Sequence, residues 1–527
     1  MNMKKLFYIL ILFPLLFVAC FDDDSNMDIH DLNPIVIELE GSNQLYVKQM
    51  DTLKVGALVY CNGVPDSLLS YEWKLLNKDI VPRILDTNMY CCAQVSEPPA
   101  NGYTLRLTVT DKTTGIFRIQ SYNLNIEANF SEGLLIADTR DGGAHSDLNL
   151  VMSREFSTNR AYQMENETRD IYYEMWKKVN GYSFDGKLKT ALTRYNYQKH
   201  FPVTAITDQE VYQGSFKTYV EWGKGSDIFF VPPDFIGQPI ESASSFFADA
   251  TKSEILIVNG RYYFCGQNET KYGLDAEILN NPDYYITHAY KPAGQYGYDA
   301  LYGYDKTNKR MLFFVWGNGY QLDEQTNTSG KFNVNDLSDY EILHIGECAE
   351  GVALVAKEIS TGKNRALVMK KVDPANTIPQ ETKIAKAAYD LGTPANFDKA
   401  IAYAMGSKGN AIYYATEHEV YAGPVDNYGT VKVQWTPEPG ETITGMQMYI
   451  WKGGKHYYED PEKEEKAIQD SEERLLLVFT CTGNGEGKVT AVPVTHTNIG
   501  ALEQNRKYHV VLEGFGEILG AYKQLNY

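Results

Sequence analysis

The sequence predicts an all-β protein in which an N-terminal β-sandwich is followed by a β-propeller of about seven blades. Short runs of strand-forming residues, separated by turn residues, recur along almost the whole chain, and up to residue 128 several of them alternate with the period of two that is typical of strands. Up to residue 128 the runs form one compact group. From residue 129 onward they gather into clusters spaced about 55 residues apart, which favours sheets that stack on one another and close a ring.

Length, composition and charge narrow the class of protein. A chain of 527 residues, 43% of them hydrophobic, can bury more than one core, so two or more domains are expected. The formal net charge of −19 argues against nucleic-acid binding and against a polybasic membrane patch, since both need clustered Lys and Arg. The expected role of this charge is to keep an acidic surface solvated.

Residues 1–19 are expected to be a lipoprotein signal peptide, because Lys4 and Lys5 precede an apolar stretch over residues 6–18. As a helix this stretch would be about 20 Å long, too short for a hydrocarbon core of about 30 Å. The sequence Phe17-Val18-Ala19-Cys20 resembles a bacterial lipobox, with Phe where Leu is commonest. The resemblance implies that Cys20 carries a diacylglycerol and, after cleavage, a further acyl chain, which together anchor a protein stably. An ordinary secretory signal with a chance cysteine is the alternative.

Residues 20–32 are expected to form an acidic tether. Asp22, Asp23 and Asp24 follow the cysteine, and adjacent like charges stay solvated. This run resembles the acidic export signal of Bacteroidetes surface lipoproteins, which implies a protein lipid-anchored to the outer membrane and facing the cell exterior. A tether that only solubilises the chain is the alternative.

Residues 33–128 predict a β-sandwich of about six or seven short strands. Two stretches, Tyr71-Glu72-Trp73-Lys74 and residues 103–111, resemble the Trp-bearing strand and the penultimate strand of a PKD-like, immunoglobulin-type domain. Trp73 is therefore expected in the core. Cys61 can pair with Cys91 or Cys92 if neighbouring strands bring them together; otherwise these cysteines are expected to act as small buried apolar residues.

Residues 129–527 are expected to form the β-propeller-like domain. The clearest hairpin has Asn259-Gly260 between residues 254–258 and residues 261–265, because this dipeptide accepts the positive φ angles of a two-residue turn. The last strands are expected to pair with the first blade near Leu134. Six or eight blades, or a string of further β-sandwiches, are the alternatives.

Two stretches interrupt the clusters of strands. The apolar spacing in residues 168–179 predicts a short helix inserted between blades. The dense charge of residues 460–474 predicts a solvated excursion, and a mobile loop is favoured there over a binding element.

No catalytic residue can be assigned, since no nucleotide-binding, hydrolase or metalloprotease motif occurs in the context that it requires. Asp138, Asp141, His145 and Asp147 lie close together, but their spacing does not match a calcium loop, so a polar hairpin turn is favoured over a metal site. The cysteines form no C-x-x-C pair, and no His lies at ligand spacing from them, so neither a metal nor a cofactor is expected.

An aromatic-rich stretch runs from Tyr284 to Tyr320. Aromatic faces suit the recognition of peptides or sugars, although alternate side chains there are expected in blade cores. The candidates for a ligand platform are Tyr296, Tyr298, Trp316 and Tyr320.

The lipobox, the acidic tether, the sandwich and the C-terminal β domain together resemble the PKD-like family lipoproteins of Bacteroidetes, which are associated with SusC/SusD-type importers. The resemblance implies an accessory surface protein that binds a nutrient and docks on SusC/SusD-like importer proteins. An oligopeptide is the favoured nutrient, and a glycan is the alternative. An enzyme, a surface hydrolase or lyase acting on a glycan or peptide, would instead have acidic or His groups with perturbed pKa values converging on one propeller face. A structural docking subunit would have an exposed apolar patch and no pocket.

Overall fold

The computed structural model describes residues 34–39, 42–78, 81–161, 164, 168–195, 200–248, 252–273, 283–292, 300–315, 321–324, 331–371, 384–460 and 462–526. Within these residues the regular structure is almost entirely β-strand, and no helix has the length and apolarity needed to cross a bilayer. The chain divides into two compact units. The smaller comprises the described residues up to Val47, with Thr52–Gln94 and Asn101–Asn125; the larger comprises Lys48–Asp51, Val95–Ala100 and the residues from Ile126 onward.

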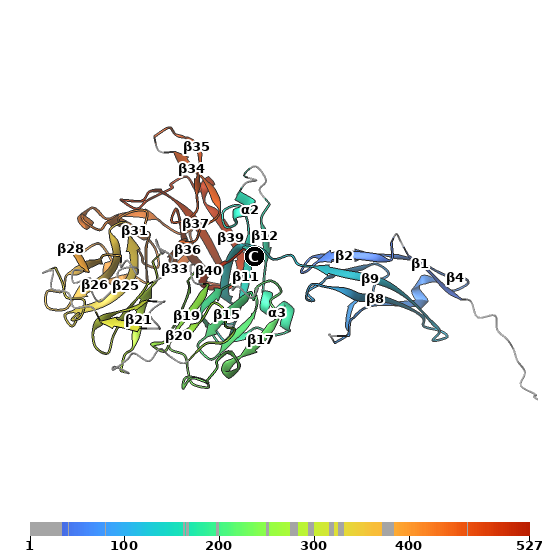
Figure 1. Ribbon diagram of the computed structural model, residues 1–527. Helices are drawn as coiled ribbons and strands as arrows, with labels where there is room; N and C mark the ends of the chain where they lie inside the picture. Colours follow the sequence, from blue (N-terminus) through green and yellow to red (C-terminus); the bar gives the residue numbers. More distant parts are fainter. Residues whose placement is uncertain are drawn as a thin grey trace, which may run out of the picture. The chain divides into compact units, whose positions relative to one another are not determined.

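Antiparallel strands build the smaller unit, of which Figure 1 labels β1, β2, β4, β8 and β9. The main sheet has five strands, in the order β2 (Gln44–Lys48), β9 (Phe117–Glu127), β8 (Ala100–Asp111), β5 (Leu69–Leu76) and β6 (Arg83–Asp86). Two further sheets pair β1 (Ile35–Leu39) with β4 (Ala57–Cys61) and β3 (Thr52–Val55) with β7 (Cys91–Gln94).

The core of the smaller unit follows from the alternation along its long strands. On β8 the residues Tyr103, Leu105, Leu107 and Val109 are all buried, and the residues between them are half-buried. Trp73, on the neighbouring strand β5, is 0% exposed. Its Nε1 donates a hydrogen bond to the carbonyl oxygen of Asn88 at 3.0 Å, and its ring lies 5.9 Å from that of Tyr122. The prediction that Trp73 is a core residue is confirmed.

The cysteines of the smaller unit lie on different short sheets. Cys61 ends β4, which pairs with β1, whereas Cys91 and Cys92 begin β7, which pairs with β3. Cys91 is buried, and burial raises the pKa of its thiol to about 12, whereas Cys92 is exposed. Cys91 therefore fits the expectation of a small buried apolar residue, and so do Cys265 and Cys348 in the larger unit.

Seven antiparallel sheets, taken in chain order, make up most of the described part of the larger unit (Figure 1). Sheet 1 has the order β40 (Glu517–Gln524), β10 (Gly133–Thr139), β11 (His145–Met152) and β12 (Asp170–Tyr172), with β13 (Phe184–Asp185) also on β11. Sheets 2, 3 and 4 run in sequence order as β14 (Leu188–Thr193), β15 (Pro202–Thr207), β16 (Val211–Ser215) and β17 (Glu221–Lys224); β18 (Ala243–Ala248), β19 (Ser253–Val258) and β20 (Arg261–Cys265); and β21 (Ile286–Tyr290), β22 (Ala300–Asp305), β23 (Arg310–Val315) and β24 (Gln321–Glu324).

Sheets 5, 6 and 7 complete the series. They comprise β25 (Tyr340–Cys348), β26 (Gly351–Glu358), β27 (Asn364–Met369) and β28 (Ala385–Gly392); β29 (Ala402–Met405), β30 (Ala411–Ala415), β31 (Val420–Pro424) and β32 (Lys432–Trp435); and β33 (Glu441–Met448), β36 (Leu475–Thr482), β37 (Gly487–His496) and β38 (Ala501–Leu502), with β39 (Val510–Phe515) also on β37. A separate hairpin, β34 (Lys455–Asp460) with β35 (Glu465–Asp470), is inserted between β33 and β36.

The predicted Asn259-Gly260 hairpin is confirmed. Val258 of β19 pairs with Arg261 of β20, so only these two residues form the turn. Their φ angles are 46° and 76°, the left-handed values that Asn and Gly tolerate best.

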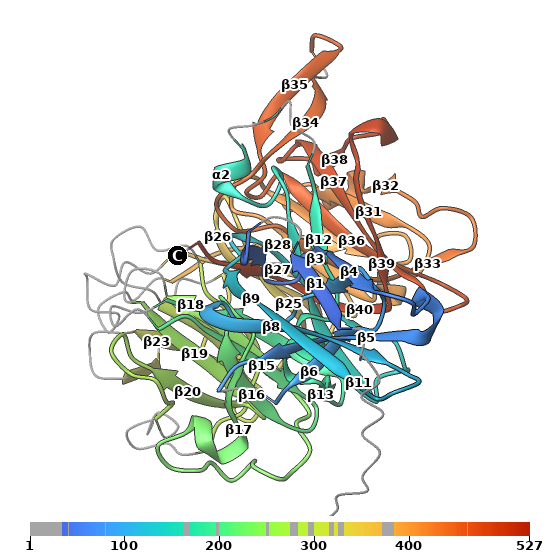
Figure 2. The same ribbon diagram turned by 90° about the vertical axis from the view of Figure 1, so that its right-hand side faces the viewer.

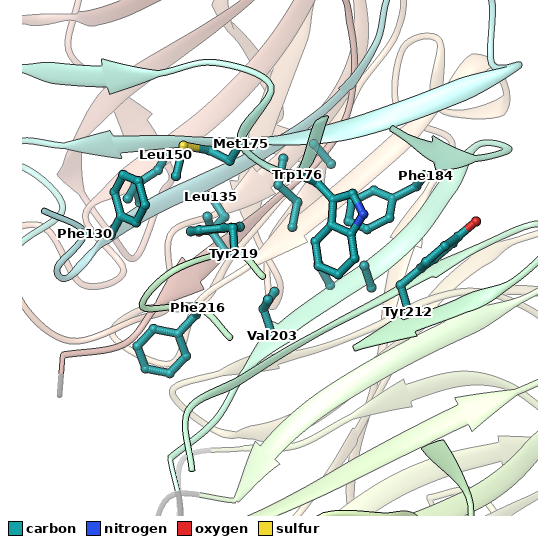
Figure 3. Packing of buried hydrophobic residues seen from close by; sticks show 14 of the residues in the cluster. Phe130, Leu135, Leu150, Met175, Trp176, Phe184, Val203, Tyr212, Phe216 and Tyr219 are labelled. Atoms are coloured by element: carbon teal, nitrogen blue, oxygen red, sulfur yellow. The ribbon is translucent and has the colours of Figure 1, made fainter. Parts of the chain in front are cut away.

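Apolar clusters lie between successive sheets. Sheets 1 and 2 share the cluster drawn in Figure 3, in which Trp176 lies 4.6 Å from Phe184 and 6.1 Å from Tyr212 between ring centroids. Six further clusters join sheets 2 and 3, 3 and 4, 4 and 5, 5 and 6, 6 and 7, and finally 7 and 1. Every sheet therefore has both of its faces covered by a neighbouring sheet.

The C-terminal strand lies beside the first strand of the larger unit. β40 pairs antiparallel with β10, with Leu134 opposite Lys523 and Leu135 opposite Tyr522. The prediction that the last strands pair near Leu134 is therefore confirmed.

Two sequence expectations differ from the structure. Residues 168–179 do not form one helix: β12 occupies Asp170–Tyr172, and the helix α3 runs from Met175 to Asn180. The helix begins there because the Asp147 carboxylate accepts hydrogen bonds from the N–H groups of Trp176 and Lys177, at 2.9 and 3.0 Å. Residues 460–474 are not an irregular loop either, since β35 forms the hairpin that projects in Figures 1 and 2.

Candidate functional site

The residues that the sequence singles out for a role lie outside the described residues. This holds for Cys20, for the acidic run Asp22, Asp23 and Asp24, and for the aromatic candidates Tyr296, Tyr298, Trp316 and Tyr320. These assignments stay predictions.

The cluster of Asp138, Asp141, His145 and Asp147 lies at the turn between β10 and β11. Asp141 accepts hydrogen bonds from the His145 N–H at 2.9 Å and pairs with the His145 imidazole at 2.7 Å. These bonds lower the pKa of Asp141 to about 2. The residues border a hollow of about 310 Å³, and among the described residues no group of three or more His, Cys, Asp or Glu side chains is placed to hold a metal.

Asp147 is the buried member of this cluster, and its role is structural. Burial raises its pKa to about 7, while the N–H groups of Leu148, Trp176 and Lys177 stabilise the charged form. Because those donors start α3 and bind it to β11, this carboxylate holds the helix in place and is not available to a ligand.

A larger cleft of about 820 Å³ lies in the larger unit, within the range of about 300–1,000 Å³ that is usual for ligand sites. Its walls come from residues 153–155 after β11, residues 168–169 before β12, the β34–β35 hairpin and residues 507–510 at the start of β39. Among the described residues, four cations line it, Arg154, Arg169, Lys466 and Lys507, with three carboxylates, Glu155, Glu459 and Glu464.

Glu155 organises the floor of this cleft. Its side chain is 3% exposed, and it accepts hydrogen bonds from the Ser153 hydroxyl at 2.5 Å and the Arg154 Nε at 3.0 Å. Arg169 lies 3.9 Å from the same carboxylate and donates to the Val511 carbonyl oxygen at 3.1 Å. One buried carboxylate thus holds two guanidinium groups beside the cleft.

The aromatic side chains of the cleft are paired with its cations. The Arg154 guanidinium carbon lies 4.7 Å from the centre of the Tyr457 ring, and the Lys466 ammonium lies 3.5 Å from it. The Lys507 ammonium lies 4.6 Å from the Tyr508 ring. These cation–π contacts order long side chains that would otherwise rotate freely at the surface.

The hairpin that forms one wall is held where it leaves the sheet. Gly453 and Gly454 have φ angles of 85° and 90°, and a Cβ on Gly454 would lie 2.0 Å from the Glu155 carbonyl oxygen, so only glycine allows this approach. Lys455 N–H then donates to the Arg154 carbonyl oxygen at 2.8 Å. Further along the hairpin, the Glu459 carboxylate accepts from the Asn505 amide at 2.9 Å.

His456 lies at the base of the hairpin and is 0% exposed. Its Nδ1 lies 3.3 Å from the Ser471 hydroxyl, and its Nε2 lies 2.9 Å from the Gln469 amide nitrogen. Burial, with Arg474 adding to it and Asp470 opposing it, lowers the pKa of His456 to about 3. The imidazole is therefore neutral at pH 7.

His456 should make the larger unit sensitive to acid. The unfolded chain takes up a proton near pH 6.5, whereas the folded chain resists it until about pH 3, so stability is lost as the pH falls through this window. Between pH 7 and 5 the loss should be about 2 kcal/mol. We expect His456→Gln to reduce the fall in unfolding free energy over this interval, measured by urea denaturation at both pH values.

The exposed His418 supplies the control. His418→Gln should leave the pH dependence of stability as it is in the parent protein. An equal fall between pH 7 and 5 in His456→Gln and the parent would show that His456 does not carry this acid sensitivity.

Sequence reasoning missed this cleft because its walls are distant along the chain. The hydrogen bond from Tyr457 to the Met164 carbonyl oxygen, for example, spans 293 residues. The available signal was local: Gly453-Gly454 is a turn signal, and it precedes the strand-favouring pair Tyr457-Tyr458.

These features define an all-β protein with a sandwich module and a larger unit of stacked sheets that carries a polar, aromatic cleft. A model of the PKD-like family matches residues 20–187, about a third of the chain. The matched residues include the strands of the sandwich and the strands β10 to β13 of the larger unit. The match indicates a surface or extracellular module. No curated protein matches the chain.

Proposed function

We propose that the seven sheets of the larger unit are the blades of a β-propeller. The first strands of several sheets contact those of their neighbours, as β14 does with β18, β25 with β29 and β29 with β33. β40 contacts both β14 and β33, so it occupies in sheet 1 the place that the first strand has in the other sheets. The seventh apolar cluster, between sheets 7 and 1, supports the closure.

The protein is anchored to the outer membrane through acyl chains on Cys20 and faces the cell exterior. This proposal rests on the lipobox-like sequence and the acidic run after it, and a PKD-like module fits an extracellular position. Lipidation needs the thiol of this one cysteine.

Cys20→Ala is expected to move the protein from the membrane fraction to the soluble fraction without changing its thermal unfolding. Cell fractionation with immunoblotting measures the shift, and Cys92→Ala, at an exposed position, is the matched control. Retention of Cys20→Ala in the membrane fraction would show that the anchor lies elsewhere. Deleting Asp22, Asp23 and Asp24 tests separately whether this run is a surface-export signal. If it is, the protein should become less accessible to added protease on intact cells.

The protein acts there as an accessory nutrient-binding subunit of a SusC/SusD-type uptake system, with an oligopeptide as the preferred nutrient. The observation that carries this proposal is the cleft of about 820 Å³, whose walls combine tyrosines with ordered charged side chains. A purely structural docking subunit would not need such a cleft. His509, in its wall, has its pKa lowered by burial, which is the kind of perturbed group that the enzyme alternative predicts, but its Nε2 already donates a hydrogen bond to the Glu503 carbonyl oxygen and is not available to a substrate.

Two measurements test this function. The tagged protein purified from outer membranes in mild detergent is expected to carry SusC/SusD-like proteins with it. The purified protein is expected to retain members of an oligopeptide pool in equilibrium dialysis and to release them chemically unchanged. Purification without any importer subunit would contradict the accessory role, and conversion of the pool would favour a hydrolase or lyase.

A further inference from the structure

We infer that the cleft recognises a carboxylate group of its ligand, through Arg169 with the support of Arg154. The inference rests on the proposed function, because it requires this cleft to be the binding site. It adds the chemical group of the ligand that the cleft recognises. The carboxylate can belong to a peptide or to a uronate sugar. The experiment below separates these two sources.

The first argument is the way in which the guanidinium groups are held. Glu155 is buried and lies between them, 3.0 Å from the Arg154 Nε and 3.9 Å from the Arg169 guanidinium. Backbone carbonyls fix the opposite sides: Arg154 donates to Met164 at 2.6 Å, and Arg169 to Val511 at 3.1 Å. Side chains that are already ordered lose little entropy when a ligand binds, which favours affinity and geometric selectivity.

The second argument is that Arg169 reaches the solvent. Its side chain is 34% exposed, whereas that of Glu155 is 3% exposed, so a ligand meets the cation and not the buried anion. A guanidinium presents a planar fork of N–H donors that matches the two oxygens of a carboxylate. Lys466 and Lys507, both exposed at the cleft, add positive charge near the same place.

The third argument concerns the balance of charge. Among the residues that the structure describes, four cations and three carboxylates line the cleft, so positive groups outnumber negative ones. The cleft therefore attracts an anion although the whole chain carries −19. Salt screens exposed charges that lie more than about 10 Å away, so the charges that line the cleft determine its electrostatic potential. Glu459 and Glu464 disfavour a doubly charged group such as a phosphate and can accept N–H or O–H donors from the rest of the ligand.

The test uses the full mature lipoprotein in detergent and two matched pairs of probes. One pair is an N-acetylated tripeptide as the free acid and as its C-terminal amide. The other is trigalacturonate and its methyl ester. The members of the peptide pair differ in one carboxylate and those of the uronate pair in three, one on each sugar, and calorimetric titration measures the dissociation constants.

We expect one free acid to bind about tenfold to a hundredfold more tightly than its neutral partner, and the pair that shows this preference identifies the source of the carboxylate. Arg169→Gln should weaken binding of that acid by a similar factor and leave the neutral partner unaffected. Arg365→Gln is the matched control, since this arginine is also ion-paired to a carboxylate, Glu358, but lies on sheet 5 outside the cleft.

Three results would overturn the inference: equal affinity for acid and neutral partner in both pairs, no binding of either acid, or unchanged acid affinity in a folded Arg169→Gln protein. If the parent protein still retains oligopeptides in dialysis, the carboxylate inference alone fails and the proposed binding function stands. If it retains nothing, both fail. Circular dichroism and thermal unfolding of Arg169→Gln establish that the variant is folded.

Discussion

Replacing Lys523 with methionine is expected to destabilise the larger unit by about 3–5 kcal/mol, because it leaves a buried carboxylate without its cation. Lys523 lies on β40, and its ammonium group is 2.7 Å from Glu132, whose side chain is 6% exposed. The same ammonium donates to the Phe156 carbonyl oxygen at 2.8 Å and to the Tyr449 hydroxyl at 3.1 Å. One side chain therefore joins the C-terminal strand to the segments beside the first and the last sheets.

The surroundings explain the size of the effect. Burial lowers the pKa of Lys523, while Glu132 opposes that shift, so the pair depends on mutual neutralisation. Among the described residues, the Thr158 backbone N–H and hydroxyl are the donors that Glu132 would retain after the substitution. Urea denaturation followed by circular dichroism measures the loss as a lower midpoint of the transition that belongs to the larger unit.

A cycle with Glu132→Gln isolates the ion pair. The double variant Lys523→Met/Glu132→Gln is expected to be more stable than Lys523→Met, since the uncompensated charge is gone. Lys363→Met, which removes an exposed ion pair with Asp390 on sheet 5, is the control and should cost less than about 1 kcal/mol. A midpoint for Lys523→Met equal to that of Lys363→Met would show that the pair does not stabilise the junction of the last and first sheets.

Trp73→Ala is expected to destabilise the smaller unit by about 3–5 kcal/mol, through the lost burial and the cavity that remains. The indole is 0% exposed between the strands of the sandwich, and its N–H is bonded to the Asn88 carbonyl oxygen, which would lose its donor. The larger unit has its own apolar clusters, so its transition should stay unchanged. The same urea titration resolves the two transitions.

Tyr46→Ala supplies the comparison for this substitution. Tyr46 lies on β2 of the same unit and is 64% exposed, so its removal should change the unfolding free energy by less than about 0.5 kcal/mol. If Trp73→Ala and Tyr46→Ala shift the transition equally, Trp73 does not support the core in the way that the structure indicates.

Local sequence predicted those parts of the fold that depend on neighbouring residues. The run Leu475 to Phe479 is apolar without interruption, and a strand with this pattern must bury both faces. In the structure Leu475 and Leu477 pack in the cluster shared with sheet 1, while Leu476 and Val478 pack in the cluster shared with sheet 6. The position of Trp73 and the Asn259-Gly260 turn are of the same kind.

The sequence was less informative where the structure of a segment depends on contacts with residues far away in the chain. The spacing of residues 168–179 predicts one helix, but α3 begins only at Met175, where the N–H groups of Trp176 and Lys177 reach the Asp147 carboxylate on β11. The charge of residues 460–474 predicts a loop, but Glu465–Asp470 form β35 because they pair with β34, and Glu464 and Lys466 line the cleft. The aromatic candidates from Tyr296 to Tyr320 remain untested, since they lie outside the described residues.

By itself, then, the sequence determined that this protein is built of strands, that most strands of the larger unit are covered on both faces, and that its last strand returns to the first. These properties follow from alternating runs, uninterrupted apolar runs and turn dipeptides, which act over short stretches of chain. Only the tertiary structure decided that Glu155 holds two arginines beside a cleft and that Lys523 neutralises Glu132. Such contacts join residues hundreds of positions apart, and a side chain's charge does not indicate which distant partner will meet it.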